Sequence, residues 1–250
     1  MKATRGILWT LDFDGTLSHL VPDRSAAVLE PECAECLQEL AADSENVVAV
    51  VSSRTLEDLE TRVRVENVLL SGSCGLEWRL PGGSRLHPGP RTEERVERER
   101  EKLMSLLEPI RPVAGVDIED KRWSVAVHIR ETAEDELKFV LQELEHLRIY
   151  HGLTLFYGPA VAEIQLLEEV SKLTAERALV RLLERQFPNP TLVYAGDDQN
   201  DVQAMRWVLE RKGIVFAVGE QISVKGACAV GDPTALAFTL RRRFMPTLET

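Results

Sequence analysis

The sequence contains no long apolar run and no excess of positive charge. No stretch reaches the roughly 18 consecutive apolar residues of a membrane-spanning helix. The net charge of the 250 residues is −11, and so acidic a chain is a poor partner for nucleic acid, whose phosphates are bound by Lys and Arg. Acidic residues also occur too early for a secretory signal. We therefore expect a cytoplasmic protein that binds neither membranes nor nucleic acid; no pattern indicates its oligomeric state.

Cysteine is scarce as well, with four residues. Cys33 and Cys36 form a C-x-x-C pair, which could be a redox pair or half of a zinc site. No second C-x-x-C or pair of histidines supplies the other half of such a site. The two cysteines have helical spacing within an expected helix, so we predict that they pack on a helix face.

What the sequence does contain is a regular alternation of apolar and amphipathic segments. Apolar runs predict strands at 7–11, 47–52, 67–71, 191–195 and 213–218. Amphipathic runs predict helices at 31–42, 55–64, 172–186, 200–211 and 233–243. This order is typical of an α/β protein with a parallel, Rossmann-like sheet.

The middle of the chain has a different pattern, which begins after a Pro/Gly-rich break at 80–90. We expect a charged helix at 91–110, a half-exposed antiparallel strand at 123–129, a helix at 132–147 and two strands within 153–166, around a turn at 157–160. The predicted organisation is an α/β domain from residues 1–82 and 166–250, with an inserted α+β unit at 83–165.

Two acidic groups follow two of the predicted core strands. Asp12 and Asp14, two residues apart at a strand end, can project to the same side. Asp197, Asp198 and Asp201 follow a later strand. Ligands of open α/β sheets bind beyond the carboxyl ends of the strands, where two such groups can converge on Mg²⁺. Without a cation, the carboxylates would repel one another and any phosphate.

Two further polar residues lie at equivalent places. Ser52 ends the second strand and Lys172 begins a helix. A hydroxyl and an ammonium group can bind the remaining oxygens of a phosphoryl group. Each residue also has a plainer interpretation, since Ser52 could cap the next helix and Lys172 could be a solvated charge.

The motifs D-x-D-G-T, a strand-end Ser, an isolated Lys and G-D-D-x-N-D, in this order, resemble those of the haloacid dehalogenase superfamily of phosphohydrolases. The resemblance implies that Asp12 is a nucleophile that forms an aspartyl-phosphate. It implies that Asp14 protonates the leaving oxygen and then activates water. Ser52 and Lys172 would hold the phosphoryl group.

The same resemblance implies a Mg²⁺ site. Its ligands would be Asp12, the backbone carbonyl of Asp14, and Asp197. Either Asp198 or Asp201 would complete the shell. Asn200 would support this motif.

A finer resemblance extends over almost the whole chain, to the trehalose-6-phosphate phosphatases. It is carried by "VDIEDKRWSVAVHIR" (116–130), "SSRTLEDL" (52–59) and "AVAEIQ" (160–165). It implies that the α/β domain is the catalytic core and that the insertion at 83–165 is a cap of the C2 type, which determines substrate specificity. It also implies a set of substrate-binding residues: Arg54, Glu119, Lys121, Arg130 and Glu163. His128 has the plainer interpretation of a residue on a strand face.

The resemblance therefore implies a Mg²⁺-dependent sugar-phosphate phosphatase that releases trehalose from trehalose 6-phosphate. Departures from the family pattern at Ser53, Cys74, Leu173, Asn200 and Val202 leave other sugar phosphates open. The alternatives are sucrose phosphate, glucosyl- or mannosyl-glycerate phosphate and a hexose phosphate. Other classes are a phosphomutase, a non-catalytic sugar-phosphate sensor and a phosphorylated receiver domain, which would be shorter and would lack the insertion.

Overall fold

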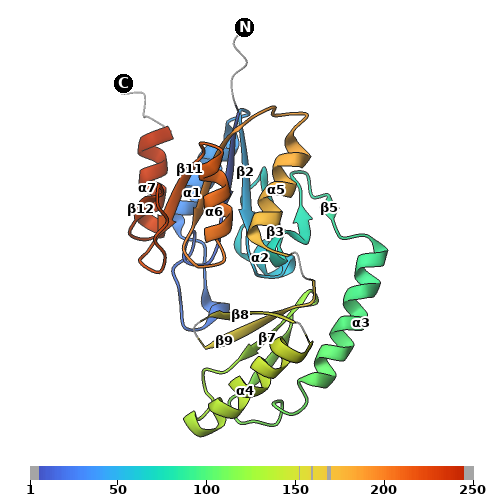
Figure 1. Ribbon diagram of the computed structural model, residues 1–250. Helices are drawn as coiled ribbons and strands as arrows, with labels where there is room; N and C mark the ends of the chain where they lie inside the picture. Colours follow the sequence, from blue (N-terminus) through green and yellow to red (C-terminus); the bar gives the residue numbers. More distant parts are fainter. Residues whose placement is uncertain (1–5, 152, 159, 168–169, 245–250) are drawn as a thin grey trace. The chain divides into compact units, whose positions relative to one another are not determined.

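The structure, a computed structural model, describes residues 6–151, 153–158, 160–167 and 170–244. The chain forms two compact units, one of Met1–His87 with Ser171–Thr250 and one of Pro88–Val170 (Figure 1). The breaks between the units fall a few residues after those expected from the sequence. The assignment of catalysis to one unit and specificity to the other stays a prediction.

The first unit is built on an eight-stranded sheet in the order β12-β11-β10-β1-β2-β3-β4-β5. The first six strands in this order are parallel, and β4 and β5 join the edge in antiparallel pairing. The strands are β1 (Ile7–Leu11), β2 (Asn46–Val51), β3 (Val68–Gly72), β4 (Glu77–Arg79), β5 (Arg85–Leu86), β10 (Thr191–Gly196), β11 (Ile214–Val218) and β12 (Cys228–Val230).

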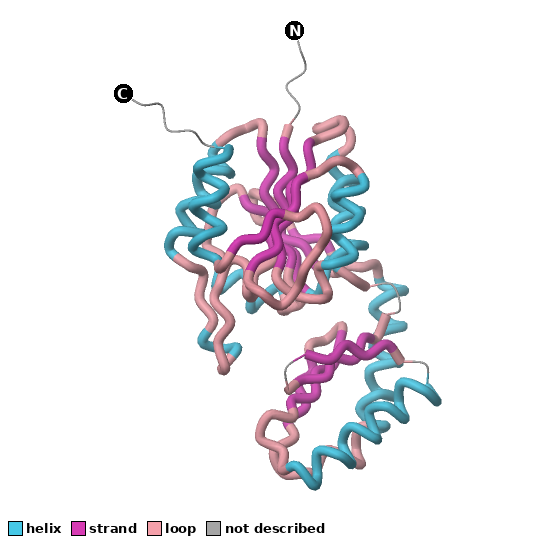
Figure 2. The backbone as a smooth tube through the Cα atoms, turned by 60° about the vertical axis from the view of Figure 1, so that its left-hand side comes forward, coloured by secondary structure: helices cyan, strands magenta, loops and turns pink. Residues whose placement is uncertain are grey.

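Helices cover both faces of this sheet, as Figure 2 shows. Alternate strand residues point to opposite faces, so Leu8 of β1 packs with α5 and α6, whereas Trp9 packs with α1, α2 and α7. The two resulting cores lie on opposite faces of the sheet, in agreement with the Rossmann-like core predicted from the sequence. The helices are α1 (Pro31–Ala42), α2 (Leu56–Arg62), α5 (Lys172–Leu183), α6 (Val202–Glu210) and α7 (Pro233–Phe244), with short 3₁₀ turns η1 (Arg24–Ala26) and η2 (Ser73–Gly75).

The second unit has a four-stranded antiparallel sheet in the order β6-β7-β9-β8, with two helices on one side of it (Figure 2). Its elements are α3 (Pro90–Leu106), β6 (Asp117–Asp120), β7 (Ser124–His128), α4 (Glu134–His151), β8 (Thr154–Gly158) and β9 (Val161–Gln165). Pro159, in the turn expected between the last two strands, lies outside the described residues.

The expectation that the strand at 123–129 is half-exposed is wrong. Residues 124–127 of β7 are all buried, and β7 is an interior strand, paired with β6 on one side and β9 on the other. Its alternation places the small Ser124 and Ala126 on one face, where neighbouring strands flank them, and the valines on the other. The C-x-x-C pair lies on α1 with both cysteines buried, which confirms the expected packing role.

Candidate active site

The site is built at the carboxyl ends of three neighbouring parallel strands. Asp12 follows β1, Ser52 follows β2 and Asp197 follows β10. The register pairs Leu11 of β1 with Ala195 of β10, and the amide of Asp12 donates to the carbonyl of Ala195 over 3.0 Å. The two acidic segments, far apart in sequence, are therefore brought side by side by ordinary sheet pairing, as the sequence predicted.

Three buried carboxylates converge there. Oxygen atoms of Asp12, Asp197 and Asp201 all lie within 4.8 Å of one another. The backbone makes room for this approach, because Gly15 has φ of +77° and a Cβ at that position would lie 1.9 Å from Oδ2 of Asp197. Glycine is thus required at position 15 both by its backbone conformation and by contact with the acidic cluster.

Lys172 lies within this acidic cluster as its counter-charge. Its Nζ is 2.9 Å from Oδ2 of Asp12 and 2.9 Å from Oδ1 of Asp201. Tyr194 also donates to Oδ1 of Asp201, over 2.7 Å. The lysine is held in place by the start of α5, where Ser171 caps the helix reciprocally with Thr174. Lys172 is 2% exposed, which excludes the solvated-charge interpretation.

The electrostatics of this cluster leave negative charge in excess. Burial raises the pKa of Asp12 and raises that of Asp197 to about 7, and neighbouring carboxylates add to both shifts. Burial opposes the charged form of Lys172, but Asp12 and Asp201 outweigh it and raise the pKa of the lysine. One ammonium cannot balance three carboxylates, and a buried oxygen-only donor set suits a hard divalent cation such as Mg²⁺.

Asp198 has a different environment from the three clustered carboxylates. Its carboxylate accepts from the backbone amide of Asn200 over 2.6 Å and from the Asn200 side chain over 3.1 Å. Asp201, in turn, accepts from the backbone amide of Asp198. Of the two residues that the resemblance left open, Asp201 is the one grouped with Asp12 and Asp197; the metal-ligand roles themselves stay predictions.

Ser52 is fully buried, and its hydroxyl accepts from the backbone amide of Arg54 over 3.1 Å. It does not cap the following helix, because Thr55 does so by accepting from the amide of Asp58. The alternative interpretation of Ser52 as an N-cap is therefore wrong.

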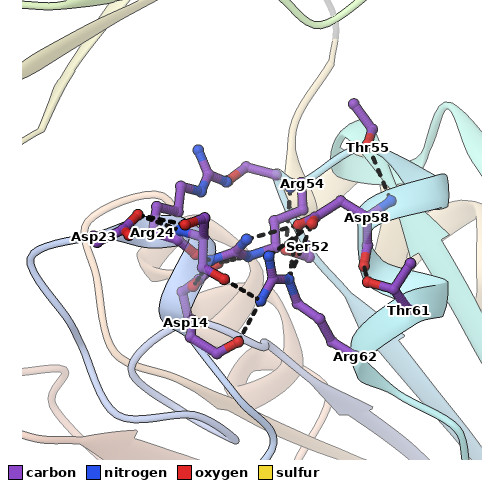
Figure 3. A network of polar contacts seen from close by, with 12 residues as sticks. Asp14, Asp23, Arg24, Ser52, Arg54, Thr55, Asp58, Thr61 and Arg62 are labelled. Carbon is purple, nitrogen blue, oxygen red and sulfur yellow. Dashed lines mark hydrogen bonds and ion pairs between the residues drawn. The ribbon is translucent and has the colours of Figure 1, made fainter.

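Asp14 lies outside the group of three carboxylates and is paired with Arg54 (Figure 3). Nε of Arg54 donates to one oxygen of Asp14 over 2.8 Å, and Nη2 donates to the other over 2.7 Å. Sequence reasoning assigned Arg54 to substrate binding and missed this pairing. It also missed Asp58, which binds Arg54, and Tyr194, which binds Asp201; no motif in the sequence marks either residue.

In the second unit, several of the polar residues expected to bind substrate gather on its sheet. Glu119 and Glu163 both pair with Ala126 of β7 in the sheet register, so they lie in one row on the same face. Glu163 accepts from Lys121 over 3.0 Å and from Ser124 over 2.8 Å. Their roles in binding stay predictions.

Of the remaining residues proposed there, His128 lies 3.0 Å from Glu119, and Arg130 follows β7.

No helix of the described residues is both long and apolar enough to cross a membrane.

Comparison with known proteins gives concordant matches. The model of the trehalose-phosphatase family matches residues 10–237. A trehalose-phosphate phosphatase of Mycobacterium tuberculosis is 32% identical over 194 residues, which cover 77% of this chain and 49% of that protein. An uncharacterized glycosyl hydrolase of the same species is 36% identical over 200 residues, covering 78% of this chain and 15% of that protein.

The chain thus spans half or less of the length of these curated relatives. Among solved structures, the C-terminal domain of Candida albicans trehalose-6-phosphate phosphatase has the same fold, with a TM-score of 0.75 at 20% identity, over 96% of this chain and 92% of that one. The resemblance to haloacid dehalogenase superfamily phosphatases is confirmed. With its family model matched over most of its length, the chain belongs to the trehalose-phosphatase family.

Proposed function

We propose that this chain is a Mg²⁺-dependent phosphatase that hydrolyses trehalose 6-phosphate through an aspartyl-phosphate. The observation that carries the proposal is the buried contact of Asp12 with Lys172 beside Asp197 and Asp201. A carboxylate held at a strand end, beside an ammonium and two further carboxylates, is suited to attack phosphorus once a cation balances the charge.

In the proposed reaction, an oxygen of Asp12 attacks phosphorus, and the bond from phosphorus to the sugar oxygen breaks. Asp14 gives a proton to that leaving oxygen. A water molecule then attacks phosphorus and gives a proton to Asp14. The bond between phosphorus and Asp12 breaks, so phosphate is released and Asp12 is restored. Ser52 and Lys172 bind the phosphoryl oxygens, where charge develops.

Asp12, the carbonyl of Asp14, Asp197 and Asp201 would hold the divalent cation. When bound, the cation keeps the carboxylates ionised and offsets the charge of the phosphoryl group.

The sugar part of the substrate is assigned to the second unit. Glu119, Lys121, Arg130 and Glu163 would donate to and accept from its hydroxyl groups. The paired Lys121 and Glu163 offer both a cation and a carboxylate on a preformed sheet, which is the kind of rigid polar surface that sugar recognition requires.

The function is tested by measuring phosphate release from a panel of esters: trehalose 6-phosphate, sucrose 6-phosphate, glucosyl-3-phosphoglycerate and glucose 6-phosphate. Each is assayed with Mg²⁺ and with chelator. We expect the highest kcat/KM for trehalose 6-phosphate and no turnover with chelator. A clear preference for another ester would overturn the substrate, and Mg²⁺-independent turnover would overturn the cofactor.

A matched pair of variants tests the sugar-binding role. Glu163→Gln is expected to lower kcat/KM for trehalose 6-phosphate by about 10-fold or more through its lost contacts, whereas replacement of the exposed Glu131 by Gln has no such effect. Equal kcat/KM for the two variants would contradict this role.

A further inference from the structure

The guanidinium of Arg54 makes four hydrogen bonds within the first unit. Besides its two bonds to Asp14, it donates from Nη1 to Asp58 over 2.6 Å and from Nη2 to the carbonyl of Arg24 over 2.8 Å. A guanidinium has five N–H donors, and these contacts use four of them. The guanidinium carbon also lies 5.5 Å from the centre of the Phe13 ring.

The contacts fix the guanidinium from several sides. The Arg54 side chain is 3% exposed, whereas that of Asp14 is 27% exposed. Asp58 sits in the first turn of α2, and it is itself held by Arg62 one turn later on that helix (Figure 3). Arg54 therefore joins Asp14, on the loop after β1, to the rigid start of α2.

The backbone of this arginine is anchored as firmly as its side chain. Its amide donates to the hydroxyl of Ser52, and its carbonyl accepts from the amide of Ser73 over 2.7 Å. Gly72 permits the end of β3 to lie close to the start of α2, because a Cβ there would lie 2.3 Å from the backbone nitrogen of Leu56. A bidentate arginine with a fixed backbone defines both the place and the plane of the carboxylate it binds.

We propose that Arg54 is a positioning residue for Asp14, and that it acts through its bidentate contact with that carboxylate and its anchorage to Asp58. The inference rests on the proposed function, in which Asp14 gives the proton to the leaving oxygen. Arg54 is then not a substrate-binding residue, because nearly all of its donors are already used within the protein.

The consequence is a dependence on the leaving group. An alkoxide of a sugar leaves poorly without a proton, so its departure needs a correctly placed Asp14. 4-Nitrophenolate is stable as an anion and leaves without a proton. For this reason, misplacing Asp14 should impair the cleavage of a sugar phosphate far more than that of 4-nitrophenyl phosphate.

The experiment measures kcat/KM for trehalose 6-phosphate and for 4-nitrophenyl phosphate with saturating Mg²⁺, in the full chain. Arg54→Gln is expected to lower kcat/KM for the sugar phosphate by about 10²-fold or more and for the aryl phosphate by less than about 10-fold. Arg54→Lys, which keeps the charge but loses the fork of donors, is expected to show the same selectivity to a smaller degree.

Two controls separate positioning from stability. Arg241→Gln removes an arginine that binds Glu35 and Glu39 on α1 and plays no part in this anchorage, so its ratio of the two kcat/KM values should equal that of the wild type. Asp14→Asn should show the selective loss, and adding Arg54→Gln to it should cause little further change in the ratio, because both act on one group. If Arg54→Gln unfolds, the two kcat/KM values are compared in Arg54→Lys instead.

Equal losses on both esters, or no loss on the sugar phosphate, would overturn the inference, since a structural or phosphate-binding role predicts a loss independent of the leaving group. If the wild type hydrolyses neither ester, both the proposed function and this inference fail. If it hydrolyses both esters and the Arg54 variants leave the ratio unchanged, only the inference fails.

Discussion

Glu176 provides a stability prediction that is independent of any assigned activity. It lies on α5, one turn after Lys172, and it is 0% exposed. Neither of its carboxyl oxygens has a partner at ordinary hydrogen-bond geometry among the described residues. Burial raises its pKa from 4.5 to about 7, with a partly compensating contribution from the Thr10 hydroxyl.

Because the pKa of Glu176 is raised, its ionisation makes the stability of the folded state depend on pH. An acid whose folded-state pKa is raised binds its proton more tightly in the folded state than in the unfolded state. The folded state therefore loses stability as the pH rises from about 4.5 to about 7, and the loss is complete at higher pH. At roughly 1.4 kcal/mol per pKa unit, the loss amounts to about 3 kcal/mol.

Glu176→Gln removes the ionisation while it keeps the size and polarity of the side chain. We expect this variant to exceed the wild type in the free energy of unfolding by about 3 kcal/mol near pH 8 and by much less near pH 5. Urea unfolding in the presence of chelator at these two pH values measures both differences. Replacement of Glu184, exposed at the end of the same helix, by Gln is the control. A Glu176→Gln difference of the same size at both pH values would refute the reasoning.

Three further predictions concern the site and the thiols. Lys172→Met is expected to lower kcat for phosphate release by about 10²-fold or more, and wild-type turnover of this variant would contradict its role. Mg²⁺ should bind more tightly at pH 8 than at pH 6, since it must displace protons from Asp12 and Asp197. Burial raises the pKa of both residues, that of Asp197 to about 7. Equal shifts of Tm on Mg²⁺ titration at both pH values would argue against this. A thiol reagent should modify the exposed Cys228 before the C-x-x-C pair, because burial raises the pKa of both those thiols to about 12. Peptide mass spectrometry measures the order of modification, and the opposite order would contradict this prediction.

Much of the fold could be predicted because its signals are local. Each long core strand is a mainly apolar run, and the helices between the strands are amphipathic. The convergence of Asp12 and Asp197 also followed from sequence, because parallel strands place their carboxyl ends at one edge of the sheet. The short strands β4, β5, β6 and β12 were not predicted, because segments of two to four residues have no period to detect.

The parts of the site that were missed depend on side-chain pairings that no sequence motif marks. Arg54 carries the same sequence signal whether it binds a substrate or Asp14, 40 positions away. Tyr194 lies in an apolar run, which suggests only a core strand residue, although its hydroxyl donates to Asp201. The burial of β7 depends on the position of that strand within its sheet, which alternation alone does not specify.

The most direct test of the account is phosphate release from trehalose 6-phosphate by Asp12→Asn with saturating Mg²⁺. The amide keeps the shape of the side chain but removes the nucleophilic carboxylate that contacts Lys172. We predict a loss in kcat of at least about 10³-fold, with the variant still folded. Turnover within a few-fold of the wild type would contradict the central claim that Asp12 attacks phosphorus.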